Sequence, residues 1–144
     1  PLRGWGLDWV VFASAGVEVE RRAAPEGHRL EVWFERSQNL FYGGVIHDFL
    51  AAPGKAHRVR LEAAGADIAS STGVFVEVLS ARRQLAVSEP FLRSTGWRTV
   101  ELRFTPGPGE RLCRLRVMRP RSDRFDNQVS GRFSLRRVSL AVSD

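Results

Sequence analysis

The amino-acid sequence predicts an all-β protein: an antiparallel β-sandwich or jelly roll of about ten strands, with little or no helix. Apolar and polar residues alternate with a period of two, most strictly over residues 57–63, which buries one face of a strand and leaves the other in water. Turns rich in glycine and proline interrupt such stretches at intervals of roughly 8 to 20 residues. Short alternating strands with frequent turns are typical of a sandwich and leave little room for a long helix.

The same two signals place each strand in order along the chain. The N-terminal half alternates over 7–12, 17–21, 29–35, 40–50 and 57–63, with turns at 24–27 and 52–54. In the second of these turns, Pro53 presets one backbone dihedral angle and Gly54 can adopt a positive one. The C-terminal half alternates over 73–80, 84–91, 98–105, 112–118 and 132–142, with turns at 70–73, 94–96 and 106–109.

Three of these strands define the predicted core, because their alternate side chains are all apolar. The core residues are Leu30, Val32, Phe34, Val74, Val76, Val78, Val100, Leu102 and Phe104. Trp33 lies on the opposite side of its strand with Glu31 and Glu35, so this second face is polar but carries a large aromatic side chain.

Length and composition fit one domain over residues 1–144, with 43% hydrophobic residues. The net charge of +6 at pH 7 attracts anions such as nucleic acid, acidic polysaccharide or anionic lipid. Arginine alternates with glutamate along the strands, so we expect ion pairs on a solvated face and no nucleic-acid partner. No apolar run reaches the roughly 18 residues of a membrane span, and a start at Pro1 without an initiator Met indicates a domain excised from a larger protein.

The reactive side chains predict no catalytic site. Cys113 is the only cysteine, which excludes an intrachain disulfide, and its alternating apolar neighbours predict a buried thiol. His28, His47 and His57 accompany no catalytic motif, and His47 and Asp48 are neighbours on a strand, so their side chains point to opposite faces. A glycosidase needs two carboxylates about 5 to 10 Å apart; glutamates beside arginines on a sheet surface are the more common explanation here. We expect no catalytic residue and no cofactor.

A ligand-binding face is the sharper hypothesis. Sugar rings present apolar C–H patches edged by hydroxyl groups, so a binding face needs flat aromatic side chains and fixed polar groups. If their strands lie side by side, six residues supply that mixture: Trp33, Tyr42, His47, Arg60, Glu77 and Arg103. The alternative for Trp33 is partial burial beneath a loop, and we assign Trp5, Trp9 and Trp97 to packing.

A second candidate is the loop over residues 123–131, where Asp126, Asn127 and Gln128 gather beside Phe125. Asx-rich turns also form for backbone reasons alone.

Four segments together resemble the galactose-binding-like jelly-roll domains that include many carbohydrate-binding modules. They are LEVWF at 30–34, NLFYGGV with FLAAPG at 39–54, STGWRTVELRFTP at 94–106 and GRFSLRRVSL at 131–140. The chain is also similar to the module appended to bacterial tetratricopeptide-repeat proteins linked to exopolysaccharide or envelope assembly. The resemblance implies a non-catalytic module that binds a saccharide or polysaccharide, including an acidic one, beside a helical-repeat domain in the bacterial periplasm or cell envelope.

One departure from that family concerns calcium. Its members often carry acidic residues in the last strand that help to hold a structural calcium ion, whereas the matching positions here are Arg136 and Arg137. Because calcium needs several oxygen ligands including carboxylates, we expect no metal there.

The rival hypothesis is a structural domain that docks onto a neighbouring domain and binds no glycan. A glycan binder should expose an aromatic side chain in a groove, whereas a docking domain should expose a flat, contiguous apolar patch.

Overall fold

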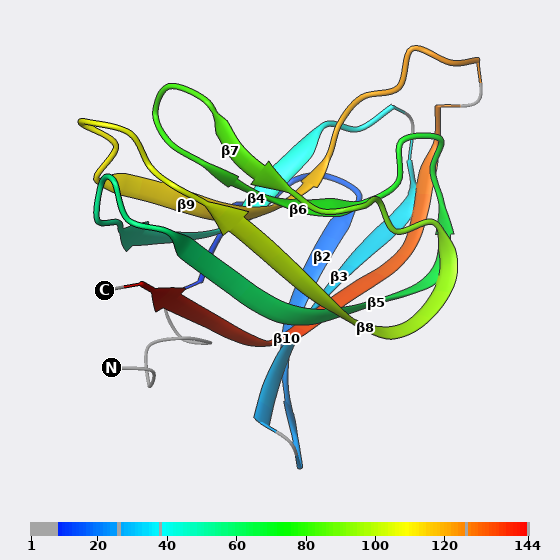
Figure 1. The fold of residues 1–144 in the computed structure, drawn as a ribbon. Helices are drawn as coiled ribbons and strands as arrows, with labels where there is room; N and C mark the ends of the chain where they lie inside the picture. The colour runs from blue at the N-terminus through cyan, green and yellow to red at the C-terminus, as the bar shows by residue number, and fades with distance from the viewer. Residues whose placement is uncertain (1–8, 26, 38, 126, 144) are drawn as a thin grey trace.

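Ten strands form two antiparallel five-stranded sheets that pack face to face in the computed structural model (Figure 1). The structure describes residues 9–25, 27–37, 39–125 and 127–143. Sheet A has the order β1 (Val10–Val11), β4 (Tyr42–Leu50), β9 (Leu112–Arg119), β6 (Phe75–Leu79) and β7 (Gln84–Val87). Sheet B has the order β2 (Val17–Ala24), β3 (Gly27–Ser37), β10 (Val129–Val142), β5 (His57–Ala69) and β8 (Arg93–Phe104). The predicted fold class is therefore confirmed.

Each predicted strand overlaps a strand of the structure, with one predicted turn in error. The first predicted strand, 7–12, is represented by Val10–Val11, and its beginning lies outside the described residues. The turn predicted at 94–96 lies inside β8, because β5 and β8 continue their pairing through two bulges to the pair Ile68–Arg93. The Ser94 hydroxyl accepts a hydrogen bond from the Asp67 N–H at 2.9 Å, so a residue typical of turns satisfies a backbone donor within the bulged ladder.

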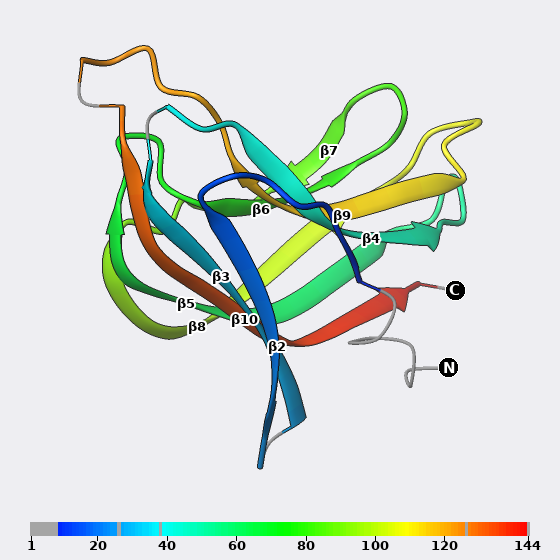
Figure 2. The same ribbon diagram turned by 180° about the vertical axis from the view of Figure 1, so that it is seen from behind.

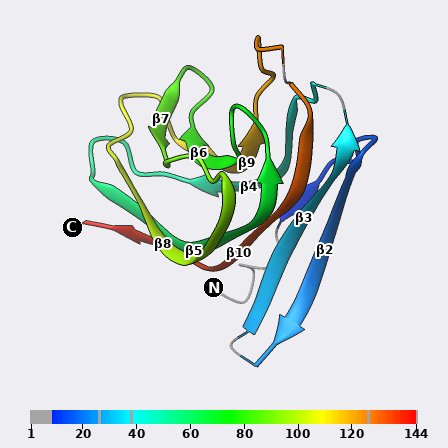
Figure 3. The same ribbon diagram turned by 90° about the vertical axis from the view of Figure 1, so that its right-hand side faces the viewer.

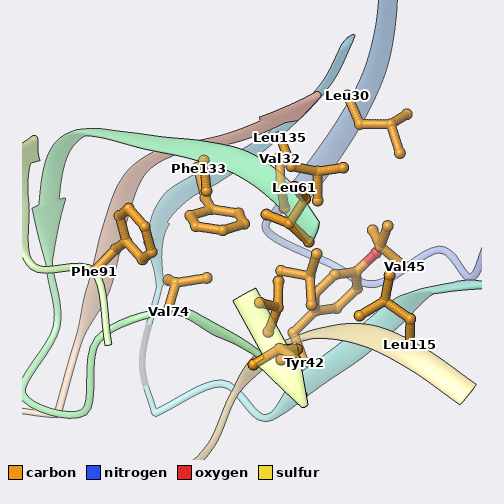
Figure 4. Close-up of a cluster of buried hydrophobic side chains, with 14 of the residues drawn as sticks. Leu30, Val32, Tyr42, Val45, Leu61, Val74, Phe91, Leu115, Phe133 and Leu135 are labelled. Carbon is orange, nitrogen blue, oxygen red and sulfur yellow. The ribbon is translucent and has the colours of Figure 1, made fainter. Parts of the chain in front are cut away.

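The core lies between the two sheets, where the apolar side of every long strand meets its counterpart (Figure 4). Eight of the nine predicted core residues are buried, and Val100 is half-buried against them. Phe91 and Phe133 meet edge to face at 5.2 Å in this core. Cys113 is buried as predicted, and burial raises the pKa of its thiol.

The turn between β4 and β5 forms around Pro53 and Gly54 as predicted and is held by a buried histidine. Gly54 has a φ of 82°, and its N–H donates to the Pro106 carbonyl at 2.8 Å. The Ala52 N–H donates to Nε2 of His57 at 3.1 Å, so the ring proton lies on Nδ1 and is donated to the Lys55 carbonyl at 2.8 Å. His57 thus closes the turn.

Hairpins and loops shape the surroundings of the two sheets. Figure 3 shows the β2–β3 hairpin extending well beyond the rest of sheet B. Figure 2 shows the β6–β7 hairpin rising on the outer side of sheet A, beside β9 and β4. No described residue belongs to a helix long and apolar enough to cross a membrane.

Candidate functional site

The structure does not bring the six predicted ligand-binding residues together. Trp33, Arg60 and Arg103 lie on the outer face of sheet B, whereas Glu77 lies on the outer face of sheet A. The other two, Tyr42 and His47, come from sheet A but point into the molecule. The expectation that their strands would combine the six residues into one surface is therefore corrected.

A β-bulge explains the burial of Tyr42. Strict alternation along β4 would place Tyr42 and Val45 on opposite faces, but the register with β9 shifts between them, so both are buried. A Cβ on Gly44 would lie 2.9 Å from the Phe12 carbonyl oxygen and from the Tyr42 ring, so this approach requires glycine. The Tyr42 hydroxyl donates to the Phe12 carbonyl at 3.1 Å, and burial raises the pKa of the phenol. Tyr42 is thus a core residue.

His47 faces the interior next to Trp9, with ring centroids 5.4 Å apart. Trp9 therefore packs as predicted, while Trp5 lies outside the described residues. Asp48, on the outer face, accepts two hydrogen bonds from Arg114, at 2.8 Å from Nε and 3.1 Å from Nη2. Those bonds lower the pKa of the Asp48 carboxyl. The predicted separation of His47 from Asp48 is confirmed.

On the outer face of sheet B, arginines cover the aromatic rings. The Arg132 guanidinium lies 4.9 Å from the centroid of Trp33, and the Arg136 guanidinium lies 3.8 Å from that of Trp97. Both tryptophans are half-buried. Trp33 lies beside Arg132 on the sheet surface and is not part of the core. A sugar that stacked on either ring would have to compete with these contacts.

The charged groups of sheet B are also paired with one another. Glu31, only 2% exposed, has Arg22 Nε at 2.7 Å, Arg29 Nε at 3.5 Å and Arg132 Nη1 at 3.8 Å. Arg103 donates from Nε to Glu101 at 2.7 Å, and Arg60 stands opposite Glu101 across the β5–β8 ladder. The predicted mixture of aromatic and charged side chains is present here, but Trp33 already contacts Arg132 and Arg103 already binds Glu101.

The outer face of sheet A carries a different arrangement, centred on Glu77. Glu77 is 4% exposed, Arg116 donates from Nε to its Oε2 at 2.6 Å, and Gln84 donates from Nε2 to its Oε1 at 2.8 Å. The β-ladder places Ile46, Arg116, Glu77 and Val87 in one row across β4, β9, β6 and β7. Arg116 and Gln84 are the polar partners that sequence reasoning missed; cross-strand charge pairing was the available signal.

Apolar side chains flank this polar row. Phe75 pairs with Met118 on one side of Glu77, and Leu79 pairs with Arg114 on the other. A pocket of about 210 Å³ lies at the second position, with Asp48, Leu79 and Arg114 among its lining residues. Fixed polar groups on a partly apolar floor match what a sugar ring requires.

Glu110 anchors the turn that borders this face. The turn between β6 and β7 spans residues 80–83, and Glu110 accepts hydrogen bonds from Ser80, from Arg83 Nη2 at 2.7 Å and from the Gly107 N–H at 2.7 Å. These donors, Arg83 first, lower the pKa of the Glu110 carboxyl to about 2. The ionised carboxylate thereby holds the turn beside the pocket.

Neither metal ligation nor the loop candidate receives support. The described ranges contain no group of three or more His, Cys, Asp or Glu side chains that could hold a metal ion. In the loop over 123–131, Phe125 is fully exposed and the Asn127 carbonyl accepts from Arg119 at 3.1 Å, whereas Asp126 lies outside the described residues.

No family model matches the sequence, and no curated protein matches it. Several solved structures are similar in fold. A carbohydrate-binding module of family 4 has a TM-score of 0.61 at 11% identity, over 89% of this chain and 79% of that chain. The CBM22-1 xylan-binding domain of Paenibacillus barcinonensis Xyn10C has a TM-score of 0.55 at 15% identity, over 93% of this chain and 85% of that chain.

Enzymes also share the architecture. The Stig cyclase FisC from Fischerella sp. TAU has a TM-score of 0.58 at 16% identity, over 94% of this chain and 72% of that chain. At such low identities the likeness concerns the fold and carries no activity with it. The chain has the β-sandwich fold of carbohydrate-binding modules, consistent with the galactose-binding-like jelly roll that its sequence motifs resemble.

Proposed function

We propose that this domain binds a saccharide on the outer face of sheet A and performs no chemistry on it. The observation that carries the proposal is the cluster of Glu77, Arg116 and Gln84, set between apolar side chains and bordered by an anchored turn. The wider setting that we propose is a bacterial protein concerned with polysaccharide or the cell envelope.

The cluster of Glu77, Arg116 and Gln84 is suited to binding because its side chains are held in place before a ligand arrives. Glu77 fixes Arg116 and Gln84, so less side-chain entropy is lost on binding. Hydrogen-bonding capacity remains: the Nη groups of Arg116 make no hydrogen bond to another described residue, and the Gln84 carbonyl oxygen is an acceptor. Neighbouring hydroxyl groups on a sugar ring offer the complementary donors and acceptors.

The carboxylates of this face favour binding over hydrolysis. A general acid in a glycosidase needs a raised pKa. Instead, Arg114 lowers the pKa of Asp48, and Glu77 is ion-paired with Arg116 at 2.6 Å. Both groups are thus arranged as hydrogen-bond acceptors.

Two other assignments remain as alternatives. Trp33, Arg60 and Arg103 offer a binding position on sheet B, which requires that a ligand displace Arg132 from the Trp33 ring. The docking function is favoured by Leu50 and Leu112, which pair directly across β4 and β9 and are 80% and 59% exposed.

A glycan array with neutral and acidic saccharides, followed by titration of variants, tests the proposal. For the best ligand, we expect Arg116→Lys and Gln84→Ala each to weaken binding about tenfold, as loss of a hydrogen bond to a polar ligand does. Trp33→Ala is the matched control on the other sheet and should bind like the wild type. The reverse pattern would move the site to sheet B, and an array without any bound glycan would favour the docking function.

A further inference from the structure

A second concave region lies at the end of the sandwich where β5 ends and β8 and β10 begin. The pocket there has a volume of about 690 Å³. Its wall is mostly polar and includes Ser70, Ser71, Arg93, Gln128 and Ser130. None of the described residues that line it is acidic. Glu77, Arg116 and Gln84 are not among its lining residues, so this pocket is separate from the site on sheet A.

A fully buried arginine stands behind this wall. Arg119 is 0% exposed and donates from Nε to the Ser70 hydroxyl at 3.1 Å. Its other donors reach the Leu40 carbonyl at 2.9 Å, the Asn127 carbonyl at 3.1 Å and the Asn39 side-chain oxygen at 3.3 Å. All four acceptors are neutral, and within the described part of the chain no carboxylate pairs with this guanidinium. Burial lowers the pKa of Arg119, but an arginine retains its charge at neutral pH.

This buried positive charge lies close to the pocket wall. Ser70 lines the pocket and accepts from Arg119, so one hydrogen bond separates the guanidinium from the lining. In the low-dielectric interior, a charge without a counterion acts more strongly on its surroundings than a solvated one.

Arg93 contributes a second positive charge at the same pocket. Its side chain is exposed and forms no hydrogen bond or ion pair with any other described residue, unlike Arg114 and Arg116 on sheet A. Its backbone has a φ of 60°, a left-handed conformation that is unusual for a residue other than glycine. Asp67, one residue before the pocket-lining Ile68, has a φ of 53°. Both residues flank the bulge in the β5–β8 ladder.

We propose that this pocket binds the carboxylate of an acidic sugar, a uronic acid unit of a polysaccharide. Arg93 would form a forked pair with the carboxylate, and Arg119 adds attraction from behind the wall. Ser130 also lines the pocket and offers a hydroxyl, whereas the Ser71 hydroxyl already donates to Ser122. Asp67, the nearest acidic residue in sequence, is not among the lining residues and accepts from the Ser94 hydroxyl at 3.3 Å. The inference rests on the proposed function for the class of ligand, but it concerns a separate site.

The test compares an oligogalacturonate with its methyl ester, which keeps the rings and removes the charges. Binding of both to the full 144-residue chain is measured by calorimetry. We expect the acid to bind about tenfold more tightly than the ester, as one charge-assisted forked pair allows. Arg93→Gln should abolish that preference, and Arg93→Lys should restore only part of it because lysine lacks the fork.

Arg111→Gln is the matched control, since Arg111 is exposed at the opposite end of the sandwich and its removal changes the net charge equally. It should retain the preference for the acid. Equal binding of acid and ester by the wild type, or an unchanged preference in Arg93→Gln, would overturn the pocket assignment. A sulfated galactose oligomer that binds more tightly than the uronate, with the same dependence on Arg93, would assign the pocket to sulfate esters instead.

Failure here is distinguishable from failure of the proposed function. If saccharides bind and Gln84→Ala weakens them while Arg93→Gln does not, only the pocket assignment falls. If Arg93→Gln abolishes the preference for the acid while Gln84→Ala has no effect, the pocket stands and the site on sheet A falls. Absence of binding for every saccharide overturns both.

Discussion

The outer faces of the two sheets use the same residue types in opposite ways. On sheet B, Arg132 and Arg136 lie over Trp33 and Trp97, and three arginines surround the buried Glu31, so aromatic and charged groups are engaged with one another. On sheet A, Glu77 holds Arg116 by Nε alone, and no described residue accepts a hydrogen bond from the other Arg116 donors. The difference shows that counting aromatic and arginine residues along a strand does not predict which side chains are free to contact a ligand.

The largest effect should come from the core that both faces share. Phe104→Ala should destabilise the fold by about 3 to 5 kcal/mol, because Phe104 is 7% exposed and packs on His57 with ring centroids 5.2 Å apart. Val76→Ala should cost less because fewer buried atoms are lost. Urea unfolding should show one transition by tryptophan fluorescence and by circular dichroism. A loss below roughly 0.5 kcal/mol at Phe104 would reverse the assignment of its face.

Substituting the central carboxylate of each face compares the two directly. Glu31→Gln should lower the free energy of unfolding by about 2 to 3 kcal/mol, because three arginines lose their shared counterion, with a discount for their partial exposure. Glu77→Gln should cost about 1 to 2 kcal/mol, because the amide oxygen can still accept from Arg116. Urea denaturation of both variants measures the difference. Equal losses would show that the surplus of arginines on sheet B has no energetic consequence.

The turn bordering the sheet A face should respond to acid. The folded pKa of Glu110 is about 2 against an ordinary value of 4.5, so its ionised form stabilises the fold above pH 4.5. That contribution is lost as the pH falls from 4.5 towards 2. Thermal midpoints of the wild type should therefore decline over this window more than those of Glu110→Gln. Parallel curves for the two proteins would remove Glu110 as the cause.

Calcium should have the smallest effect, namely none on the thermal midpoint. Arg136 and Arg137 donate to the two oxygens of Glu62 at 2.8 and 3.3 Å, so this carboxylate is occupied and two cations already stand beside it. Thermal midpoints with calcium and with chelator should coincide. A rise of several degrees with calcium would reveal a site on this part of the surface.

Strand alternation correctly predicted most of the core residues. A single bulge in β4 made the predicted position of Tyr42 wrong. Residues such as Val32, Val76 and Leu102 are buried as the period of two predicts. At Gly43 and Gly44 an extra residue shifts the register, which moves Tyr42 from the predicted ligand face into the core. The expected separation of His47 and Asp48 survived because both lie beyond the bulge, where alternation resumes.

The sequence by itself therefore determined the fold class, the strands and most of the core, because these depend on local alternation and turn chemistry. Only the tertiary structure decided which strands share a sheet: it placed Trp33 and Glu77 on opposite sides of the molecule and joined Glu77 to Arg116, 39 residues later in the chain. It also decided that Arg119 is buried behind Ser70, since strand order and loop packing arise from contacts between distant segments. A local pattern cannot encode such contacts, because side-chain period specifies a face but not the neighbour across it.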